Sequence, residues 1–230
     1  MKKKLSRLCV LFMEKAVAAD APIMKGYMRH QFDFFGVKKP ARLKIGQQFF
    51  KEFGKPTVEE IPNFVQFLWQ QPERELQYFG NDINEKFVIN FPATYLTHIE
   101  WCITHKSWWD TVDTLAIRVA GEFFKVHPAL QVTTTERWIS SNNFWLQRVA
   151  VIHQLKYKQD TNEQMLFDYC SRLKSSDEFF IQKGIGWALR EYSKTNPEAV
   201  IRFVAQTDLA KFSKKEALKW LKNSGGVTDI

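Results

Sequence analysis

The sequence is poor in the residues that build disulfides, metal sites and tight turns. It has three cysteines among 230 residues, and no Cys-x-x-Cys pair occurs. Few, widely spaced cysteines argue against a disulfide scaffold and a zinc site, so we expect a protein of the reducing cytoplasm that holds no metal ion and no other cofactor. Glycine and proline number only 10 and 8, which argues against a β-sandwich with many turns.

The sequence also lacks a long apolar run and the common nucleotide-binding motifs. Basic residues at positions 2–4 and 7 precede an apolar stretch, but this stretch covers only residues 8–13 and ends at Glu14 and Lys15. A signal peptide needs a longer apolar region, and a membrane span needs about 20 apolar residues. No P-loop, Rossmann glycine pattern or Gly-x-Ser-x-Gly elbow is present. We therefore expect an amphipathic first helix and no membrane partner.

Positive charge and aromatic side chains are what the chain has in excess. Lysine and arginine number 33 against 25 acidic residues, which gives a net charge of +8, and the pI is about 9.3. Such a balance favours an anionic partner such as nucleic acid or an anionic membrane surface, although a protein that is merely basic is the alternative. Hydrophobic residues make up 45% of the chain, which is enough for a substantial core.

Local signals favour helices along the whole chain. The capping-box pattern, in which two side chains satisfy free amide groups at a helix start, occurs at Thr57-x-x-Glu60, Thr161-x-x-Gln164 and Ser213-x-x-Glu216. Asn196-Pro197-Glu198 offers a cap, a first-turn proline and an early acid. Apolar residues recur between these signals at steps of three and four, and no alternating strand pattern is evident. The chain is therefore predicted to be all-α, with about twelve helices joined by short loops.

The second half of the chain contains an internal repeat. Residues 137–157 read RWISSNNFWLQRVAVIHQLKY and residues 172–192 read RLKSSDEFFIQKGIGWALREY, an offset of 35 residues. A period of this size is typical of stacked helical hairpins. We therefore predict a solenoid of HEAT-like helical repeats with a concave basic groove. It is expected to form a single domain over residues 1–230, with the clearest repeats at 102–136, 137–171 and 172–206.

The 35-residue offset also predicts rows of equivalent side chains along the concave surface. It aligns Asp113 with Arg148 and Lys183, which gives a charged row that is acidic, then basic, then basic. The two cations, and Arg190 after them, suit phosphate contacts, although Arg190 could equally belong to a solvated helix surface. Trp187 stands where the earlier repeats have isoleucine, so it is either additional core or an aromatic wall.

The run Ser107-Trp108-Trp109-Asp110-Thr111-Val112-Asp113 is the most informative segment of the sequence. Trp109 and Asp113 are four residues apart and share one face of a helix. Asp110 lies near the helix start, where a capping role is sufficient to explain it, whereas Asp113 lies almost a turn further in. Asp113 is either a solvated helix acid or a carboxylate held beside an aromatic surface to stabilise a cationic ligand.

Taken together, these segments resemble the AlkD-type bacterial DNA alkylation repair glycosylases, and the similarity covers nearly the whole chain. The matching segments are Tyr27-Met28-Arg29, Phe34-Phe35-Gly36-Val37 with Pro40, residues 107–113, Asn143-Phe144-Trp145-Leu146-Gln147-Arg148, Phe179-Phe180-Ile181-Gln182-Lys183 and Gly186-Trp187-Ala188-Leu189-Arg190-Glu191-Tyr192.

This resemblance implies excision of N3- and N7-alkylated purines, such as 3-methyladenine and 7-methylguanine, from duplex DNA without a metal or organic cofactor. It implies a monomeric, cytoplasmic bacterial enzyme of base excision repair that does not take the base into a deep pocket. The family's catalytic carboxylate falls on Asp113, and its two cleft indoles fall on Trp109 and Trp187.

The resemblance also implies a set of DNA-contacting residues. Arg148 falls on a DNA-contacting arginine of the family, and Tyr27 and Arg190 match further contact positions. Lys38 stands where an uncharged polar residue is expected near the lesion, so this local contact departs from the family's pattern.

Two other functional classes compete with the glycosylase hypothesis. One is a non-catalytic HEAT-like module that grips bent or branched DNA, and the other is a solenoid that binds protein partners. A pure DNA binder has no need of Asp113 facing a polyanion, where a carboxylate repels phosphate. Binding to a protein partner would be insensitive to salt, whereas DNA binding depends strongly on salt.

Overall fold

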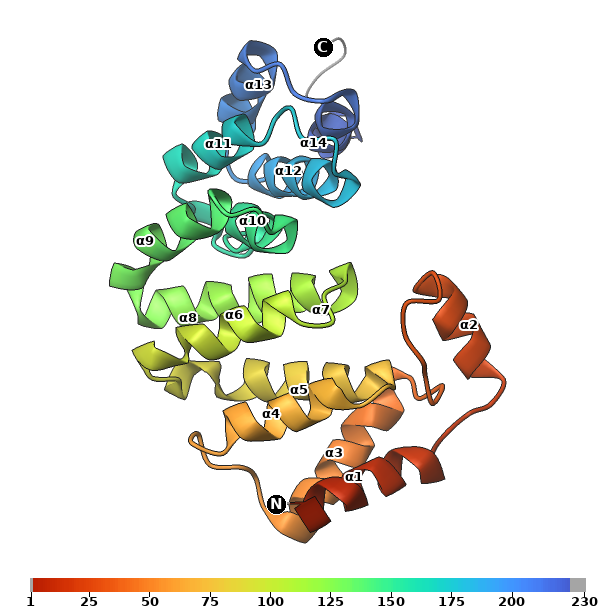
Figure 1. Cartoon of the computed structure of the whole chain (residues 1–230). Coiled ribbons are helices and arrows are strands. Elements are labelled where there is room, and N and C mark those ends of the chain that lie inside the picture. The colour runs from red at the N-terminus through yellow and green to blue at the C-terminus, as the bar shows by residue number, and fades with distance from the viewer. Residues whose placement is uncertain (1, 224–230) are drawn as a thin grey trace. The chain divides into compact units, whose positions relative to one another are not determined.

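The computed structural model describes residues 2–223, and this part of the chain is built from helices (Figure 1). The only β-type pairing within it is an isolated bridge between Asp33 and Glu73. The all-α fold class predicted from the sequence is therefore confirmed. No helix in residues 2–223 combines the length and the apolar character that a bilayer crossing requires.

The chain divides into two compact units, residues 1–98 and 99–230, and each is described by itself. The single domain expected over residues 1–230 stays a prediction. The first unit contains the helices α1 (Lys2–Glu14), α2 (Asp20–Tyr27), α3 (Lys39–Phe53), α4 (Ile61–Gln70) and α5 (Arg74–Phe87), followed by the short 3₁₀ helices η1 (Val88–Asn90) and η2 (Ala93–Tyr95). Helix α6 (Leu96–Thr104) spans the boundary between the units.

Phenylalanine rings form the core of the first unit. The ring centroid of Phe49 on α3 lies 5.9 Å from that of Phe64 on α4 and 6.4 Å from that of Phe79 on α5. Phe12 on α1 lies 6.1 Å from Phe79. Each of four helices thus contributes one ring to the cluster, which explains why the abundant phenylalanines are compatible with a folded core.

The buried carboxylate of Glu75 on α5 fixes the segment that precedes α3. Its oxygens accept hydrogen bonds from the backbone amides of Phe35, Gly36 and Val37, at 3.1, 2.8 and 2.9 Å. Burial raises the pKa of this carboxyl group, and the three donors oppose that shift. Gly36 has φ +84°, and a Cβ there would lie 2.2 Å from the Val17 carbonyl oxygen, so only glycine fits.

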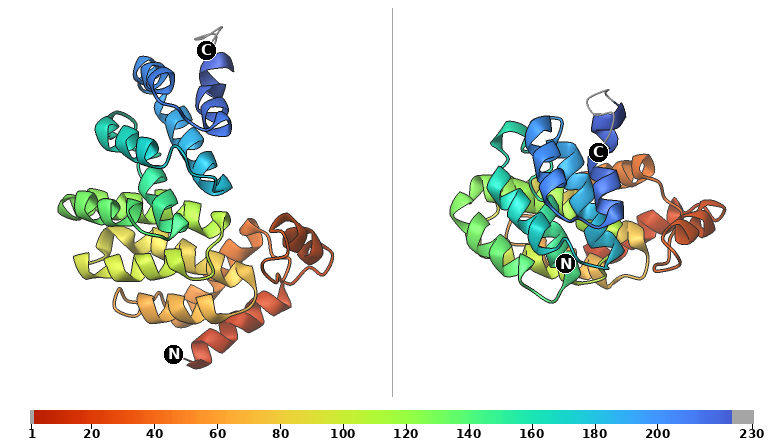
Figure 2. Two further views of the ribbon diagram at one scale, coloured as in Figure 1. Left: turned by 45° about the horizontal axis from the view of Figure 1, so that its top comes forward. Right: turned by 90° about the horizontal axis from the view of Figure 1, so that it is seen from above.

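The second unit is a stack of helix pairs. It contains α7 (Trp109–Thr114), the π-helical segment η3 (Leu115–Ala120), α8 (Gly121–Val126), α9 (Pro128–Ile139), α10 (Phe144–Ile152), the 3₁₀ helix η4 (Lys158–Asp160), α11 (Glu163–Arg172), α12 (Phe179–Tyr192), α13 (Pro197–Gln206) and α14 (Lys211–Asn223). Helices α9, α11 and α13 lie along one side, and α10, α12 and α14 lie along the other (Figures 1 and 2).

Helices α7, η3 and α8 form one continuous helix with a π-helical middle. Counted once, it leaves thirteen α-helices among the described residues, close to the predicted dozen. After the π segment, the Tyr157 hydroxyl donates to the carbonyl oxygen of Gly121 at 2.6 Å. A Cβ at Gly121 would lie 2.6 Å from the His153 carbonyl oxygen, so the backbones approach closely here.

The sequence repeat reappears as a repeat of contacts. The amide of Gln147 donates to the Ser141 carbonyl oxygen at 2.8 Å, and the amide of Gln182 donates to the Ser176 carbonyl oxygen at 2.9 Å. Ser141 and Ser176 are 35 residues apart, as are Gln147 and Gln182. The same contact therefore closes the turn before α10 and the turn before α12.

A second repeated contact joins consecutive helix pairs. Arg137 at the end of α9 forms an ion pair with Glu100, and Arg172 at the end of α11 forms one with Glu136. The same arginine of the repeat therefore reaches back to an acid of the preceding helix pair, which supports the stacked arrangement within this unit.

Two buried histidines hold their neutral form in the folded protein. In the second unit, His153 Nδ1 lies 2.8 Å from the Ala150 carbonyl oxygen, so Nδ1 carries the proton and Nε2 accepts from the Gln131 amide at 2.9 Å. In the first unit, His98 Nε2 lies 3.0 Å from Asn84 Oδ1. Desolvation lowers the pKa of each histidine to about 4.

These histidines predict a loss of stability on acidification. Because the folded-state pKa lies below the unfolded-state value, the unfolded chain binds more protons as pH falls from about 6.5 towards 4, and stability falls across that window. Each unit of difference between the two pKa values corresponds to about 1.4 kcal/mol per histidine. Urea unfolding at pH 7 and pH 5 measures the effect.

Matched variants separate the histidines from other acid effects. His153→Gln in the second unit and His98→Gln in the first are each expected to have a shallower pH dependence than the unmodified protein. An unchanged slope in His153→Gln would contradict this assignment.

Candidate active site

Asp113 and Asp110 occupy different environments on helix α7. Asp110 lies in the first turn, where its Oδ1 accepts a hydrogen bond from the Thr111 backbone amide at 2.9 Å. Asp113 lies nearly one turn further on, and its side chain is 17% exposed. The carboxylate of Asp110 is thus engaged locally at the helix start, whereas that of Asp113 faces the next helix pair.

The carboxylate of Asp113 is held in a two-point ion pair with Arg148 on α10. Arg148 Nε lies 2.8 Å from Asp113 Oδ1, and Nη2 lies 2.9 Å from Oδ2. The third guanidinium nitrogen, Nη1, donates to the carbonyl oxygen of Phe180 on α12. This fork geometry fixes both the position and the plane of the carboxylate.

Close packing of α12 keeps the guanidinium in place. Only 1% of the Arg148 side chain is exposed. A Cβ at Gly184 on α12 would lie 3.0 Å from Arg148 Nη1, so the glycine leaves the room that the arginine fills. Helices α7, α10 and α12 therefore each supply one part of the arrangement: a carboxylate, a guanidinium and a carbonyl oxygen.

The structure thus brings together two residues of the predicted charged row. The sequence aligned Asp113 and Arg148 as neighbours, but it gave no reason to pair them directly. Because the Arg148 guanidinium is buried and pairs with the carboxylate, the contacts of Arg148 favour a role in holding Asp113 in position. Its contact with a DNA phosphate stays a prediction, and the buried position does not favour it.

Lys183 and Arg190, the other predicted phosphate contacts on α12, differ in their surroundings. The Lys183 side chain is exposed, and its ammonium lies 5.7 Å from the ring centroid of Phe179. Arg190 forms an ion pair with Glu216 on α14. A phosphate would therefore meet Lys183 directly, whereas it would compete with Glu216 for Arg190.

The two indoles of the predicted cleft, Trp109 and Trp187, are each partly exposed, on α7 and α12. The neighbouring Trp108 instead packs inward, with its ring centroid 6.1 Å from that of Trp145 and 5.2 Å from that of Phe180. Sequence reasoning missed this inner aromatic cluster. The repeat itself contained a signal for this cluster. Trp145 and Phe180 are 35 residues apart, and each directly follows a residue aligned with Trp109, namely Phe144 and Phe179.

Tyr27 and Lys38 belong to the first unit and are described within it. Tyr27 ends α2 and is 69% exposed. Lys38 directly precedes α3, and its ammonium lies 2.9 Å from a carboxylate oxygen of Asp20. Both side chains lie at the surface of this unit, and their predicted contacts with DNA stay predictions.

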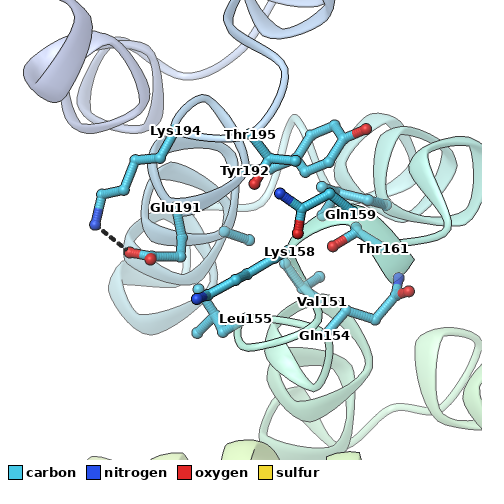
Figure 3. A pocket seen from close by; sticks show the side chains of 12 residues that line it. Val151, Gln154, Leu155, Lys158, Gln159, Thr161, Glu191, Tyr192, Lys194 and Thr195 are labelled. Atoms are coloured by element: carbon cyan, nitrogen blue, oxygen red, sulfur yellow. Dashed lines mark hydrogen bonds and ion pairs between the residues drawn. The ribbon is translucent and has the colours of Figure 1, made fainter.

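A cavity of about 290 Å³ has a lining that includes neither Asp113 nor Arg148, and Figure 3 shows its side chains. Twelve residues line it, mainly from the end of α10, η4, the start of α11 and the end of α12, and none of them is a predicted site residue. The candidate active site is centred instead on the fixed, partly exposed carboxylate of Asp113. Among residues 2–223, no group of three or more potential ligand residues is placed to hold a metal ion.

Comparison with known proteins shows the family to which this chain belongs. The family model described as DNA alkylation repair enzyme matches residues 11–221, and the chain belongs to this family. A solved structure described as a predicted DNA alkylation repair enzyme from Enterococcus faecalis is 32% identical, with a TM-score of 0.84, and the match covers 90% of this chain and 96% of that one.

More distant solved structures share the fold. The smu.31 protein of Streptococcus mutans UA159 is 19% identical with a TM-score of 0.61, over 86% of this chain and 98% of that one. AlkD2 from Streptococcus mutans is 18% identical with a TM-score of 0.58, over 80% of this chain and 88% of that one. No protein with a curated functional description matches the chain.

Breaking the Asp113–Arg148 pair is expected to destabilise the protein strongly. Arg148→Met leaves a largely buried carboxylate without its partner, so we expect the free energy of unfolding to fall by about 3–5 kcal/mol in urea titrations. Arg148→Lys keeps the charge but loses the fork, so its loss is expected to be smaller.

The exposed pair Arg172–Glu136 provides the matched control. Arg172→Met removes exposed ion pairs with Glu136 and Asp168, each of which is expected to contribute less than about 1 kcal/mol. If Arg148→Met were as mild as this control, the structural importance of the buried pair would be disproved.

Proposed function

We propose that this protein is a DNA glycosylase that hydrolyses the N-glycosidic bond of N3- and N7-alkylated purines in duplex DNA. The observation that carries the proposal is the Asp113 carboxylate, which Arg148 fixes at a partly exposed position on the basic chain of a DNA alkylation repair family member. A carboxylate held in a fixed position repels phosphate, but it is suitable for stabilising a cation.

The chemistry of the substrate explains why one carboxylate is sufficient. Alkylation at N3 or N7 gives the purine a positive charge, so the base leaves readily. As the bond between C1′ and the purine nitrogen breaks, its electron pair neutralises the base and positive charge develops on the sugar. A water oxygen then bonds to C1′ and releases a proton. The enzyme needs only to stabilise the developing sugar cation and to position the water.

Asp113 is suited to the electrostatic part of this task. Arg148 uses one acceptor site on each carboxylate oxygen, which leaves further lone pairs for the substrate or a water molecule. Because the carboxylate is already oriented, little reorganisation is needed when charge develops. The fixed orientation of the carboxylate therefore suits electrostatic stabilisation of the developing charge.

The two partly exposed indoles suit the cationic nucleotide. The π faces of Trp109 and Trp187 attract a positive charge, and each such contact is worth about 0.5–1 kcal/mol at an exposed site. Such open contacts agree with a surface site, in which the lesion is recognised by its charge and its sugar–phosphate backbone.

Release of free base tests the proposal. The unmodified protein is expected to release 7-methylguanine or 3-methyladenine from duplex DNA under single-turnover conditions. Asp113→Asn is expected to lower that rate by about 100- to 1,000-fold, the usual effect of removing one preorganised charge-stabilising group. Binding to the same duplex is expected to stay nearly unchanged.

Asp110→Asn is the matched control, because it neutralises an acid on the same helix that engages the Thr111 amide. Its rate is expected to stay within a few-fold of the unmodified protein. Circular dichroism checks that each variant is folded. Equal losses of binding and base release in Asp113→Asn would refute the assignment of Asp113, and salt-sensitive DNA binding without any base release would favour the non-catalytic DNA-binding module.

A further inference from the structure

Helix α14 carries a large share of the positive charge of the chain. Its thirteen residues contain five lysines and one glutamate, a net charge of +4 within a chain whose net charge is +8. A basic stretch is often only a solvated helix face, so its geometry and its counter-charges decide whether it can act as a binding surface.

Four of the five lysines share one face of the helix. Lys211, Lys215, Lys219 and Lys222 are exposed and follow one another at steps of four and three, so they form a single stripe. The buried residues of α14 are Ser213, Ala217, Leu218 and Leu221. We call the stripe the α14 lysine face. At about 1.5 Å per residue it extends over about 16 Å.

The acids near the α14 lysine face are Glu216 on the helix itself and, at the start of the helix, Asp177 and Asp208, which line one surface cavity together with Lys211. The one acid on the helix, Glu216, pairs with Arg190 of α12 and lies 3.8 Å from Lys219. Within residues 2–223, Lys211, Lys215 and Lys222 form no ion pair. No carboxylate of the described part of the chain therefore pairs with these three ammonium groups, and they are available to an external polyanion.

The α14 lysine face lies next to Lys183 of α12, a predicted phosphate contact. Phe212 beside Lys211 stacks on Phe179 of α12, with ring centroids 5.4 Å apart, and Phe179 is 47% exposed. The ammonium of Lys183 lies over the same Phe179 ring, at 5.7 Å from its centroid. The positive surface of α12 therefore continues onto α14.

We propose that the α14 lysine face binds the phosphate backbone of duplex DNA; this inference rests on the proposed function of the candidate active site. Each DNA strand carries one phosphate per about 3.4 Å of helix axis, so a face of about 16 Å spans about five phosphates. An anionic membrane fits less well, because Ala217, Leu218 and Leu221 are buried and Phe212 and Trp220 are only partly exposed, which leaves little apolar surface to insert between lipids.

The salt dependence of binding to undamaged duplex DNA tests the proposal. The variant with Lys211, Lys215, Lys219 and Lys222 all changed to Gln is expected to lower the slope of log K against log salt by about 1.8 to 3.6, since each lost phosphate contact contributes about 0.9. Its affinity loss between 50 and 200 mM salt is then roughly 10- to 150-fold smaller than that of the unmodified protein. The corresponding fourfold Lys→Arg variant keeps the charges and is expected to keep the slope.

A control variant removes the same charge elsewhere. Lys44, Lys51, Lys55 and Lys156 are exposed residues outside α14, and their joint change to Gln is expected to reduce the slope much less. An equal reduction in both variants would show an effect of overall charge and overturn the proposal. Binding to anionic vesicles, together with an unchanged DNA slope, would also overturn it.

Base release distinguishes failure of this inference from failure of the proposed function. With the DNA saturated at low salt, the fourfold Gln variant is expected to release alkylated base at the unmodified single-turnover rate. An unchanged DNA slope with normal base release overturns only the α14 lysine face. A reduced slope in a protein that releases no base supports the α14 lysine face and refutes the glycosylase.

Discussion

The ion pair between Asp113 and Arg148 is the interaction on which the candidate site depends. Removing two charges from water costs about as much as their attraction returns, so such a pair contributes little net stability. The pair instead fixes the position of the Asp113 carboxylate. Helix α7 supplies this carboxylate, α10 the guanidinium and α12 the carbonyl oxygen of Phe180. The arginine also offsets a negative charge that would otherwise repel the phosphates of DNA. Order in three successive helix pairs is thus coupled to the orientation of one carboxylate.

Much of the helical scaffold could be predicted because its signals are local. The 35-residue repeat is confirmed by contacts that recur at the same spacing, such as the turns closed by Gln147 and Gln182. The predicted cap at Asn196 is confirmed, since its side chain accepts from the Ala199 amide at 3.2 Å. The different environments of Asp110 and Asp113 also follow from helix position alone. In each case the interacting residues lie within a few positions of one another, or repeat with a fixed period.

The remaining features depend on contacts between segments that are distant in sequence. The capping box predicted at Ser213 is wrong, because α14 already begins at Lys211 and the Ser213 hydroxyl donates to the Gln182 carbonyl oxygen of α12. The alignment placed Arg148 beside Asp113, but it could not show that the guanidinium is buried. That burial depends on the absence of a side chain at Gly184, one helix pair further along the chain. A pattern of residue types cannot reveal such a space.

The π-helical segment η3 divides a continuous helix into two registers. A π turn contains one more residue than an α turn, so it rotates the residues after it by about 100° relative to an uninterrupted helix. The first register directs Asp113 towards Arg148, and the second presents the backbone of Gly121 to His153 and Tyr157. The π-helical segment therefore lets one continuous helix direct the Asp113 carboxylate and the Gly121 backbone towards different neighbours. Sequence changes that adjust the contact with His153 can be accommodated without turning the carboxylate away from its partner.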